Sequence, residues 1–252
     1  MASDTALSAP GTRTAAPERT ERAADLLARL TPDDLHPGRL TGPHAWHPWG
    51  LAVRPPTDHL LRLVAINRDP DTIERLLDHL QTQLQRPTWP PRPPLQVERQ
   101  GSRLDCRAAD GRRGVLHVEQ RDAVPSAVGR DVVTRDGWPI TDELAALNDR
   151  LDHIDPDQPS RDDLTDLARW VHQKMTAPAP TVNLACSLPD LLRTQAEQHP
   201  DAATRLTSIL ERGVAQVQNS ELGALAYLWD WHRQAAVRHP QPVRATTRVR
   251  AR

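Results

Sequence analysis

LQVERQGSRLDCRAADGRRGVLHV, residues 95–118, is the stretch that decides the fold. Apolar and polar residues alternate in three short runs, and Gly101 and Gly111 fall between the runs. Alternation with a period of two is typical of strands that bury one face, and glycine accepts the positive φ of a tight turn. The stretch therefore predicts a three-stranded meander whose buried face carries Leu95, Val97, Leu104, Cys106, Ala108, Leu116 and Val118.

Two helices are predicted before the meander. In residues 18–30 the apolar side chains fall three or four apart, and Thr31-Pro32 ends this helix because the residue before a proline resists the α conformation. A second helix is expected to begin at Asp69, a good N-cap, with Pro70 at its first position. Its apolar stripe consists of Ile73, Leu76, Leu77, Leu80 and Leu84.

The chain between these two helices is predicted to hold a loop and a hairpin. Residues 36–50, HPGRLTGPHAWHPWG, are so rich in proline and glycine that we expect a structured loop. Residues 51–54 and 59–66 are rich in strand formers, and the Pro-Pro-Thr-Asp sequence between them predicts a hairpin turn. Together with the meander, these elements describe an α+β unit whose sheet has one covered face.

From Thr141 onward the apolar residues keep a helical spacing. Ser160 with Asp163 resembles a capping box, Ser187 starts another helix, and five helices ending near Val237 predict a small bundle. The expected fold class is therefore α+β, with an N-terminal antiparallel sheet and two helices followed by a C-terminal α-helical bundle. The expected divisions are a disordered leader at 1–17, an α+β domain at 18–135, the bundle at 136–238 and an Arg-rich tail at 239–252.

The composition weakens any argument from the abundance of arginine. The chain has no Phe, 24 Pro and 32 Lys and Arg residues, of which only Lys174 is a lysine, and this skew is typical of a GC-rich genome. The formal net charge is −1, whereas a protein that coats nucleic acid usually carries a clear positive excess. Any nucleic-acid contact is therefore expected to be local.

Three patterns bear on the compartment. The N-terminus has no secretory pattern, and no apolar run is long enough to span a bilayer. Cys106 and Cys186 are too few and too far apart for a disulfide framework or a zinc site. We therefore expect a soluble cytoplasmic protein with reduced, buried cysteines and no membrane contact.

Tryptophan is frequent in a chain so short of aromatic residues. Trp46 and Trp49 lie in the proline-rich stretch, and Trp231 lies at the edge of a wide apolar arc on the predicted last helix. All three are candidate partner-binding anchors, because exposed tryptophans often dominate binding energy. The alternative is that Trp46 and Trp49 pin an irregular loop onto the sheet.

The same stretch holds two histidines, His44 and His47. A pair of histidines three residues apart can share a metal, but in a loop that spacing is not specific. No Asp or Glu lies between Asp34 and Asp58 to complete a site locally. The prediction is therefore no metal and no cofactor, with a metal-dependent role for His44 and His47 kept as an alternative.

The C-terminal end carries a basic tail, because no acidic residue follows Asp230. Such a tail can contact phosphates without reading bases. The alternative is a disordered terminus whose arginines reflect the genome. The candidate nucleic-acid-binding residues are Arg238, Arg244, Arg248, Arg250 and Arg252.

No Gly-rich phosphate loop, nucleophile-elbow serine or HExxH motif is present in the sequence. The leading hypothesis is therefore a non-catalytic cytoplasmic accessory protein that acts through contacts with an unidentified protein partner. Two alternatives stay open. One is a nucleic-acid-associated factor that uses the C-terminal Arg-rich tail, and the other is a metal-dependent enzyme that uses His44 and His47.

Overall fold

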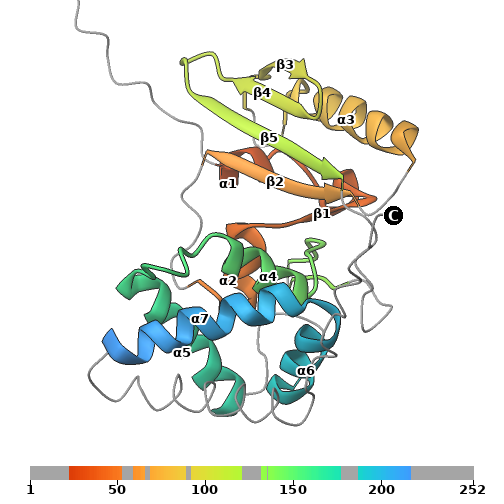
Figure 1. Cartoon of the computed structure of the whole chain (residues 1–252). Helices are drawn as coiled ribbons and strands as arrows, with labels where there is room; N and C mark the ends of the chain where they lie inside the picture. Colours follow the sequence, from red (N-terminus) through yellow and green to blue (C-terminus); the bar gives the residue numbers. More distant parts are fainter. Residues whose placement is uncertain are drawn as a thin grey trace, which may run out of the picture.

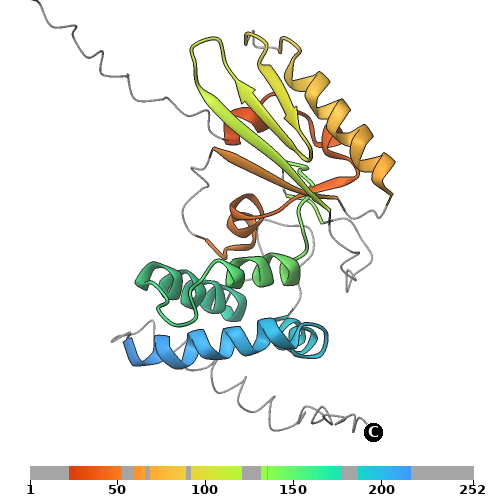
Figure 2. The same ribbon diagram turned by 45° about the horizontal axis from the view of Figure 1, so that its top comes forward.

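The computed structural model describes residues 23–52, 59–65, 69–88, 92–120, 132–134, 136–176 and 187–216. A five-stranded sheet with its helices forms one part, and further helices gather beyond its β1 edge (Figures 1 and 2). The sheet part comprises α1 (Ala23–Leu27), a 3-10 helix (Pro32–Leu35), β1 (Gly38–Leu40), β2 (Leu60–Ala65), α3 (Pro70–Leu84), β3 (Gln96–Gln100), β4 (Arg103–Arg107) and β5 (Arg113–Gln120). The helical part comprises α2 (Pro43–Trp49), α4 (Glu143–Asp152), α5 (Arg161–Thr176), α6 (Leu188–Gln198) and α7 (Pro200–Gln216). The predicted α+β class is confirmed.

The sheet has the strand order β1-β2-β5-β4-β3. Strands β3, β4 and β5 form the predicted antiparallel meander, and Gly101 and Gly111 have φ values of 59° and 84° in its two turns. Strand β5, however, pairs in parallel with β2, because α3 and the β3–β4 hairpin carry the chain back before β5 begins. The sheet is therefore mixed, whereas the sequence predicted an antiparallel one.

One face of the sheet is covered by α1 and α3, which contact the strands of the meander and β2. Helix α3 begins as expected, with Pro70 in its first turn and the Asp69 side chain accepting a hydrogen bond from the Asp71 N–H at 3.1 Å. Its predicted apolar stripe is buried against the sheet. On the strands, the side chains of Leu61, Leu104 and Leu116 are fully buried.

Residues 36–50 were expected to form a loop, but they contain strand β1 and helix α2. The same residues that suggested a loop set the helix ends. Pro43 occupies the first turn, where no backbone N–H is needed, and Gly50 closes the helix in the left-handed conformation at φ 78° and ψ 8°. Pro48 lies inside α2, but in a helix of seven residues its missing N–H removes only one hydrogen bond.

The predicted hairpin of residues 51–54 with 59–66 is wrong. Strand β2 is present at Leu60–Ala65, but β1 occupies one of its edges and β5 the other. Both rows of backbone hydrogen-bonding groups on β2 are therefore used, and residues 51–54 have no edge of β2 left to pair with. Leu51 is instead buried in the core, and residues 53–58 lie outside the described part.

Two helices of the helical part begin at the predicted signals, and a third has a cap that was not predicted. Asp142 caps α4 by accepting from the Ala145 N–H at 2.8 Å. Ser160 and Asp163 exchange side-chain hydrogen bonds with each other's backbone N–H at the start of α5, which confirms the capping box. Ser187 caps α6 through the Asp190 N–H. The expected break at 219–220 and the last helix lie outside the described residues.

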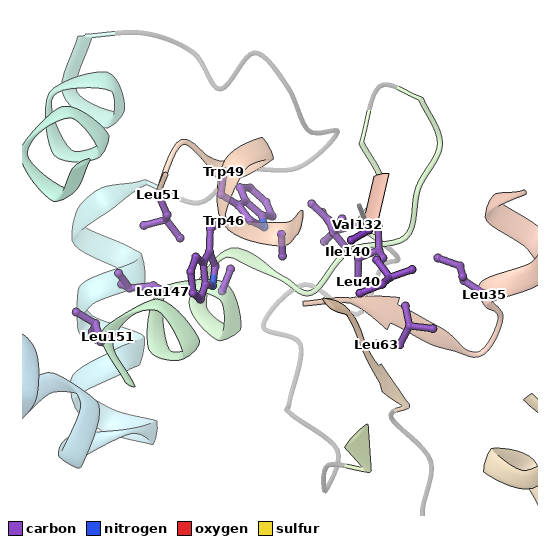
Figure 3. Packing of buried hydrophobic residues seen from close by; sticks show 14 of the residues in the cluster. Leu35, Leu40, Trp46, Trp49, Leu51, Leu63, Val132, Ile140, Leu147 and Leu151 are labelled. Carbon is purple, nitrogen blue, oxygen red and sulfur yellow. The ribbon is translucent and has the colours of Figure 1, made fainter. Parts of the chain in front are cut away.

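A single cluster of buried apolar residues runs from the sheet into the helices. Figure 3 shows the part where the two meet, with Leu40 and Leu63 on the sheet, Trp46 and Trp49 on α2, and Leu147 on α4. Helix α2 is the link, because it directly follows β1 in the chain yet packs against α4. The two halves, as far as they are described, therefore share one core.

Candidate functional site

The face of the sheet opposite α1 and α3 is polar, and we call it the open face. Strand alternation brings onto it every second residue of β2 to β5, together with Arg39 of β1. Five arginines face three carboxylates there, which is a formal excess of two positive charges with histidine counted as neutral. The charged residues are Arg39, Arg62, Arg103, Arg107, Arg113, Glu98, Asp105 and Glu119.

Three cationic or imidazole side chains form one row across the open face. Arg62 on β2 lies opposite His117 on β5, and His117 lies opposite Arg103 on β4. Neighbouring strands are about 4.8 Å apart, so the three Cα atoms span roughly 10 Å. We call Arg62, His117 and Arg103 the basic row.

His117, at the centre of the basic row, has a polar partner on each ring nitrogen. Its Nε2 lies 3.1 Å from the Ser102 Oγ, and its Nδ1 lies 3.8 Å from the Glu119 Oε1. About a third of the His117 side chain is exposed (36%), so it is reachable from solvent. At the end of the row, the Arg103 guanidinium donates to both carboxylate oxygens of Asp105 at 2.7 to 3.1 Å.

At the other end of the row, Arg62 meets the helical part. Its Nη1 lies 2.9 Å from the Nε2 of His153, which caps the C-terminus of α4. The Nδ1 of His153 lies 2.7 Å from the Asp149 backbone carbonyl oxygen, which can only accept a hydrogen bond. Arginine can only donate, so His153 carries its proton on Nδ1 and accepts on Nε2. This arrangement requires the neutral imidazole.

Trp46 of α2 packs against the imidazole of His153. The imidazole of His153 meets the indole edge-on, with ring centroids 5.0 Å apart and planes at 67°. The indole Nε1 donates to the buried Asp149 carboxylate at 2.9 Å, and the Arg150 guanidinium lies 5.1 Å from the indole centroid. Arg150 in turn forms an ion pair with Asp163 on α5. The position of Arg62 is thus tied to three helices.

Gly42 forms the corner between the sheet and α2. Its φ of 66° and ψ of −150° lie in a region that is essentially restricted to glycine. A Cβ at this position would lie 3.4 Å from the Arg62 Cδ, so the backbone passes close to the arginine stem. The corner and the start of the basic row are therefore adjacent.

The two predicted partner-binding tryptophans of residues 36–50 are buried in the structure. Trp46 and Trp49 are each 7% exposed, and the Trp49 Nε1 donates to the Thr141 carbonyl oxygen at 2.9 Å. In this conformation both indoles belong to the core and offer no surface to a partner, and α2, rather than a loop, carries them. The partner-binding role of these residues stays a prediction.

The remaining predicted partner contacts lie outside the described residues. They are the anchor Trp231 and the tail arginines Arg238, Arg244, Arg248, Arg250 and Arg252, and their roles also stay predictions. Of the two cysteines, Cys106 is buried as expected, and Cys186 lies outside the described residues.

The two predicted metal-ligand candidates lie on α2. The side chain of His44 is buried, whereas His47 is exposed. The Nδ1 of His47 lies 3.1 Å from the Ala52 carbonyl oxygen. Within the described ranges, no three His, Cys, Asp or Glu side chains gather in a way that could hold a metal ion. In the same ranges, every helix is too short or too polar to cross a bilayer.

Sequence reasoning missed the basic row and His153. The alternation in residues 95–118 already put Arg103 and His117 on the polar side of the meander. The sequence does not show the strand register that places Arg103 opposite His117. It also does not show the pairing of β5 with β2, which places Arg62 beside His117. His153 lies 91 residues from Arg62, and no local pattern connects the two.

Comparison with known proteins gives little beyond distant likeness. No family model matches the chain, and no curated protein matches it. A structure described as a "putative nucleotidyltransferase" from H. pylori is similar at 14% identity and a TM-score of 0.41, over 86% of this chain and 94% of that one. JHP933 from Helicobacter pylori is similar at 12% identity and a TM-score of 0.40, over 86% and 91% of the two chains.

These matches correct the leading functional hypothesis. The sequence predicted a non-catalytic accessory protein because it holds no recognisable reactive motif. Over most of its length, however, the chain is similar to a structure described as an enzyme, so the non-catalytic assignment is withdrawn. The likeness is too distant to carry an activity to this chain, and the function has to be argued from the open face itself.

Proposed function

We propose that the open face binds a phosphate-bearing anion, and that the ligand class is a nucleotide or another polyphosphate ester. The observation that carries this proposal is the basic row, in which Arg62, His117 and Arg103 lie side by side on three neighbouring strands. Guanidinium groups match phosphate oxygens with paired hydrogen bonds.

The length of the row favours an extended anion. A single phosphate can contact one or two of these side chains, whereas a row of roughly 10 Å offers contacts along a chain of phosphates. The donors are also held in advance, since His153 positions Arg62 and Asp105 positions Arg103. Positioned donors bind with a smaller loss of side-chain entropy than mobile ones.

The positive charge of the open face contrasts with the net negative charge of the whole chain. The chain carries a formal charge of −1, yet the open face has more arginines than carboxylates. An anion is therefore attracted to this face rather than to the molecule as a whole.

Calorimetric titration of the full chain with ATP, pyrophosphate and adenosine tests the proposal. ATP and pyrophosphate are expected to bind, with an affinity that falls as the salt concentration rises, because part of the attraction is between exposed charges. Adenosine is expected to bind at least tenfold more weakly than ATP. Equal binding of adenosine and ATP, or no binding of either phosphate compound at millimolar concentration, would contradict it.

A further inference from the structure

Ser102 lies beside the basic row, at the turn between β3 and β4. Its Oγ is within hydrogen-bonding distance of the His117 Nε2, at 3.1 Å, and the other ring nitrogen of His117 points toward the Glu119 carboxylate at 3.8 Å. A hydroxyl, an imidazole and a carboxylate in this order form the arrangement by which a serine is activated as a nucleophile.

The fold sets this order through the sheet itself. His117 and Glu119 are two residues apart on β5, so they share the open face. Val118, which lies between these two residues, donates its backbone N–H to the Ser102 carbonyl oxygen at 2.9 Å. This hydrogen bond holds the β3–β4 turn against β5. Gly101 precedes Ser102 at a φ of 59°, a conformation that keeps the turn tight.

The contact between His117 and Glu119 favours one tautomer of the imidazole. A carboxylate can only accept a hydrogen bond, so a proton on Nδ1 faces Glu119 and leaves Nε2 to accept from the serine hydroxyl. At 3.8 Å this contact is longer than a hydrogen bond. Such contacts commonly shorten when substrate binds and the charge on the imidazole develops.

The two arginines of the basic row flank His117 on the neighbouring strands. Negative charge that develops on phosphate oxygens above His117 would therefore lie between two fixed guanidinium groups. Fixed donors aimed at developing charge are a major source of transition-state stabilisation. Ser102, His117, Arg62 and Arg103 thus provide a nucleophile, a base and the charge stabilisation at one place.

We propose that Ser102 is a nucleophile that attacks the phosphorus atom of a phosphate ester or anhydride bound on the basic row. A bond forms between the Ser102 Oγ and phosphorus, and the bond from phosphorus to the leaving-group oxygen breaks. The Nε2 of His117 takes the serine proton, and the leaving group departs with the electron pair of the broken bond. No oxidation occurs. Glu119 is a positioning residue that orients His117.

This inference deepens the proposed function and rests on it for the identity of the substrate. The reactivity of Ser102 can nevertheless be measured separately with an alkyl fluorophosphonate, which needs no anion site. Attack by the Oγ breaks the phosphorus–fluorine bond and leaves a stable adduct on the serine. The experiment treats the full chain with this probe and locates the adduct by peptide mass spectrometry.

The expected result is an adduct on Ser102. Ser102→Ala should abolish it, and His117→Gln should slow it by about 10²-fold or more, as removal of a general base does. Ser208→Ala is the matched control, because the Ser208 Oγ donates to the Thr204 carbonyl oxygen on α7 and has no histidine partner. Labelling of that variant should equal labelling of the unmodified chain.

Glu119→Gln separates a positioning role from a structural one. The carboxylate orients His117, so Glu119→Gln should slow labelling of Ser102 while circular dichroism stays unchanged, and the conservative variant Glu119→Asp should restore part of the rate. The inference is overturned if folded protein gives no adduct on Ser102, or if His117→Gln labels at the original rate. ATP binding that persists in that case leaves the proposed function standing, whereas labelling without ATP binding removes the proposed function alone.

Discussion

Arg62 on β2 donates through its Nη1 to the Nε2 of His153 at the end of α4, over 2.9 Å. This hydrogen bond joins the open face of the sheet to the helical part. Because the Nδ1 of His153 already donates to the Asp149 carbonyl oxygen, its Nε2 is left to accept from Arg62. The end of the basic row is therefore held by a residue of another element.

A double-mutant cycle with Arg62→Met and His153→Phe measures this contact. We expect a coupling free energy of about 0.5–1.5 kcal/mol, the usual worth of a hydrogen bond. Urea denaturation of the four proteins supplies the energies. A coupling free energy of zero would show that His153 does not accept from Arg62.

Trp46→Phe is expected to destabilise the protein by about 1.5–3 kcal/mol. The substitution keeps an aromatic ring in the core but removes the hydrogen bond from the indole Nε1 to the buried Asp149 carboxylate, and bonds to charged groups are the more valuable ones. Trp138→Phe serves as the control, since Trp138 is only partly buried against the core. Denaturation midpoints that fall equally in both variants would contradict this account of Trp46.

Gly42→Ala is expected to destabilise the protein by about 1–3 kcal/mol. The space for a Cβ exists, since its nearest neighbour would be the flexible Arg62 stem at 3.4 Å. The cost therefore comes from the backbone, whose φ of 66° and ψ of −150° an alanine rarely adopts. Thermal unfolding measures the loss, and a variant as stable as the parent would mean that the corner between β1 and α2 relaxes without strain.

Asp34 is expected to stabilise the fold only above acidic pH. Burial alone would raise the pKa of its carboxyl group, but hydrogen bonds from the Thr31 side chain and backbone, together with His79, outweigh burial and lower the pKa below 3.8. A pKa that is lower in the folded state contributes stability above the unfolded value, and this is lost as pH falls through the folded value. The carboxylate of Asp34 should therefore matter at pH 6 and progressively less as the pH falls below 3.8.

Urea denaturation of the parent and Asp34→Asn between pH 2.5 and 7 tests this dependence. The parent should be more stable at pH 6, and the two curves should converge as the pH falls below 3.8. A gap between the parent and Asp34→Asn that widens toward low pH would reverse the sign and refute the assignment.

Local patterns in the sequence predicted those elements whose cause is local. The meander followed from alternation in residues 95–118, and the starts of α3, α5 and α6 followed from their capping residues. Helix α2 was missed because Gly42, Pro43 and Pro48 are also the residues of loops. Only the dihedral angles of Gly42 and Gly50 distinguish a helix with sharply defined ends from an irregular segment.

Long-range relations could not be predicted in the same way. The parallel pairing of β5 with β2 decides that Arg62 joins His117 and Arg103, and it depends on where α3 and the hairpin return the chain. The burial of Trp46 and Trp49 depends on α4, about a hundred residues further along. The sequence therefore indicated which side of each strand is polar, but not which polar residues meet.

The central claim is that the basic row binds phosphate. Its most direct test is the affinity of the full chain for ATP in Arg62→Gln and Arg103→Gln, each compared with the parent by calorimetry at one fixed salt concentration. Arg193→Gln is the matched control, because Arg193 is an exposed arginine paired with Asp190 on α6, away from the sheet. The account predicts that each row variant loses at least about tenfold in affinity, equivalent to about 1.4 kcal/mol, while Arg193→Gln binds like the parent. Equal affinities in all four proteins would contradict it.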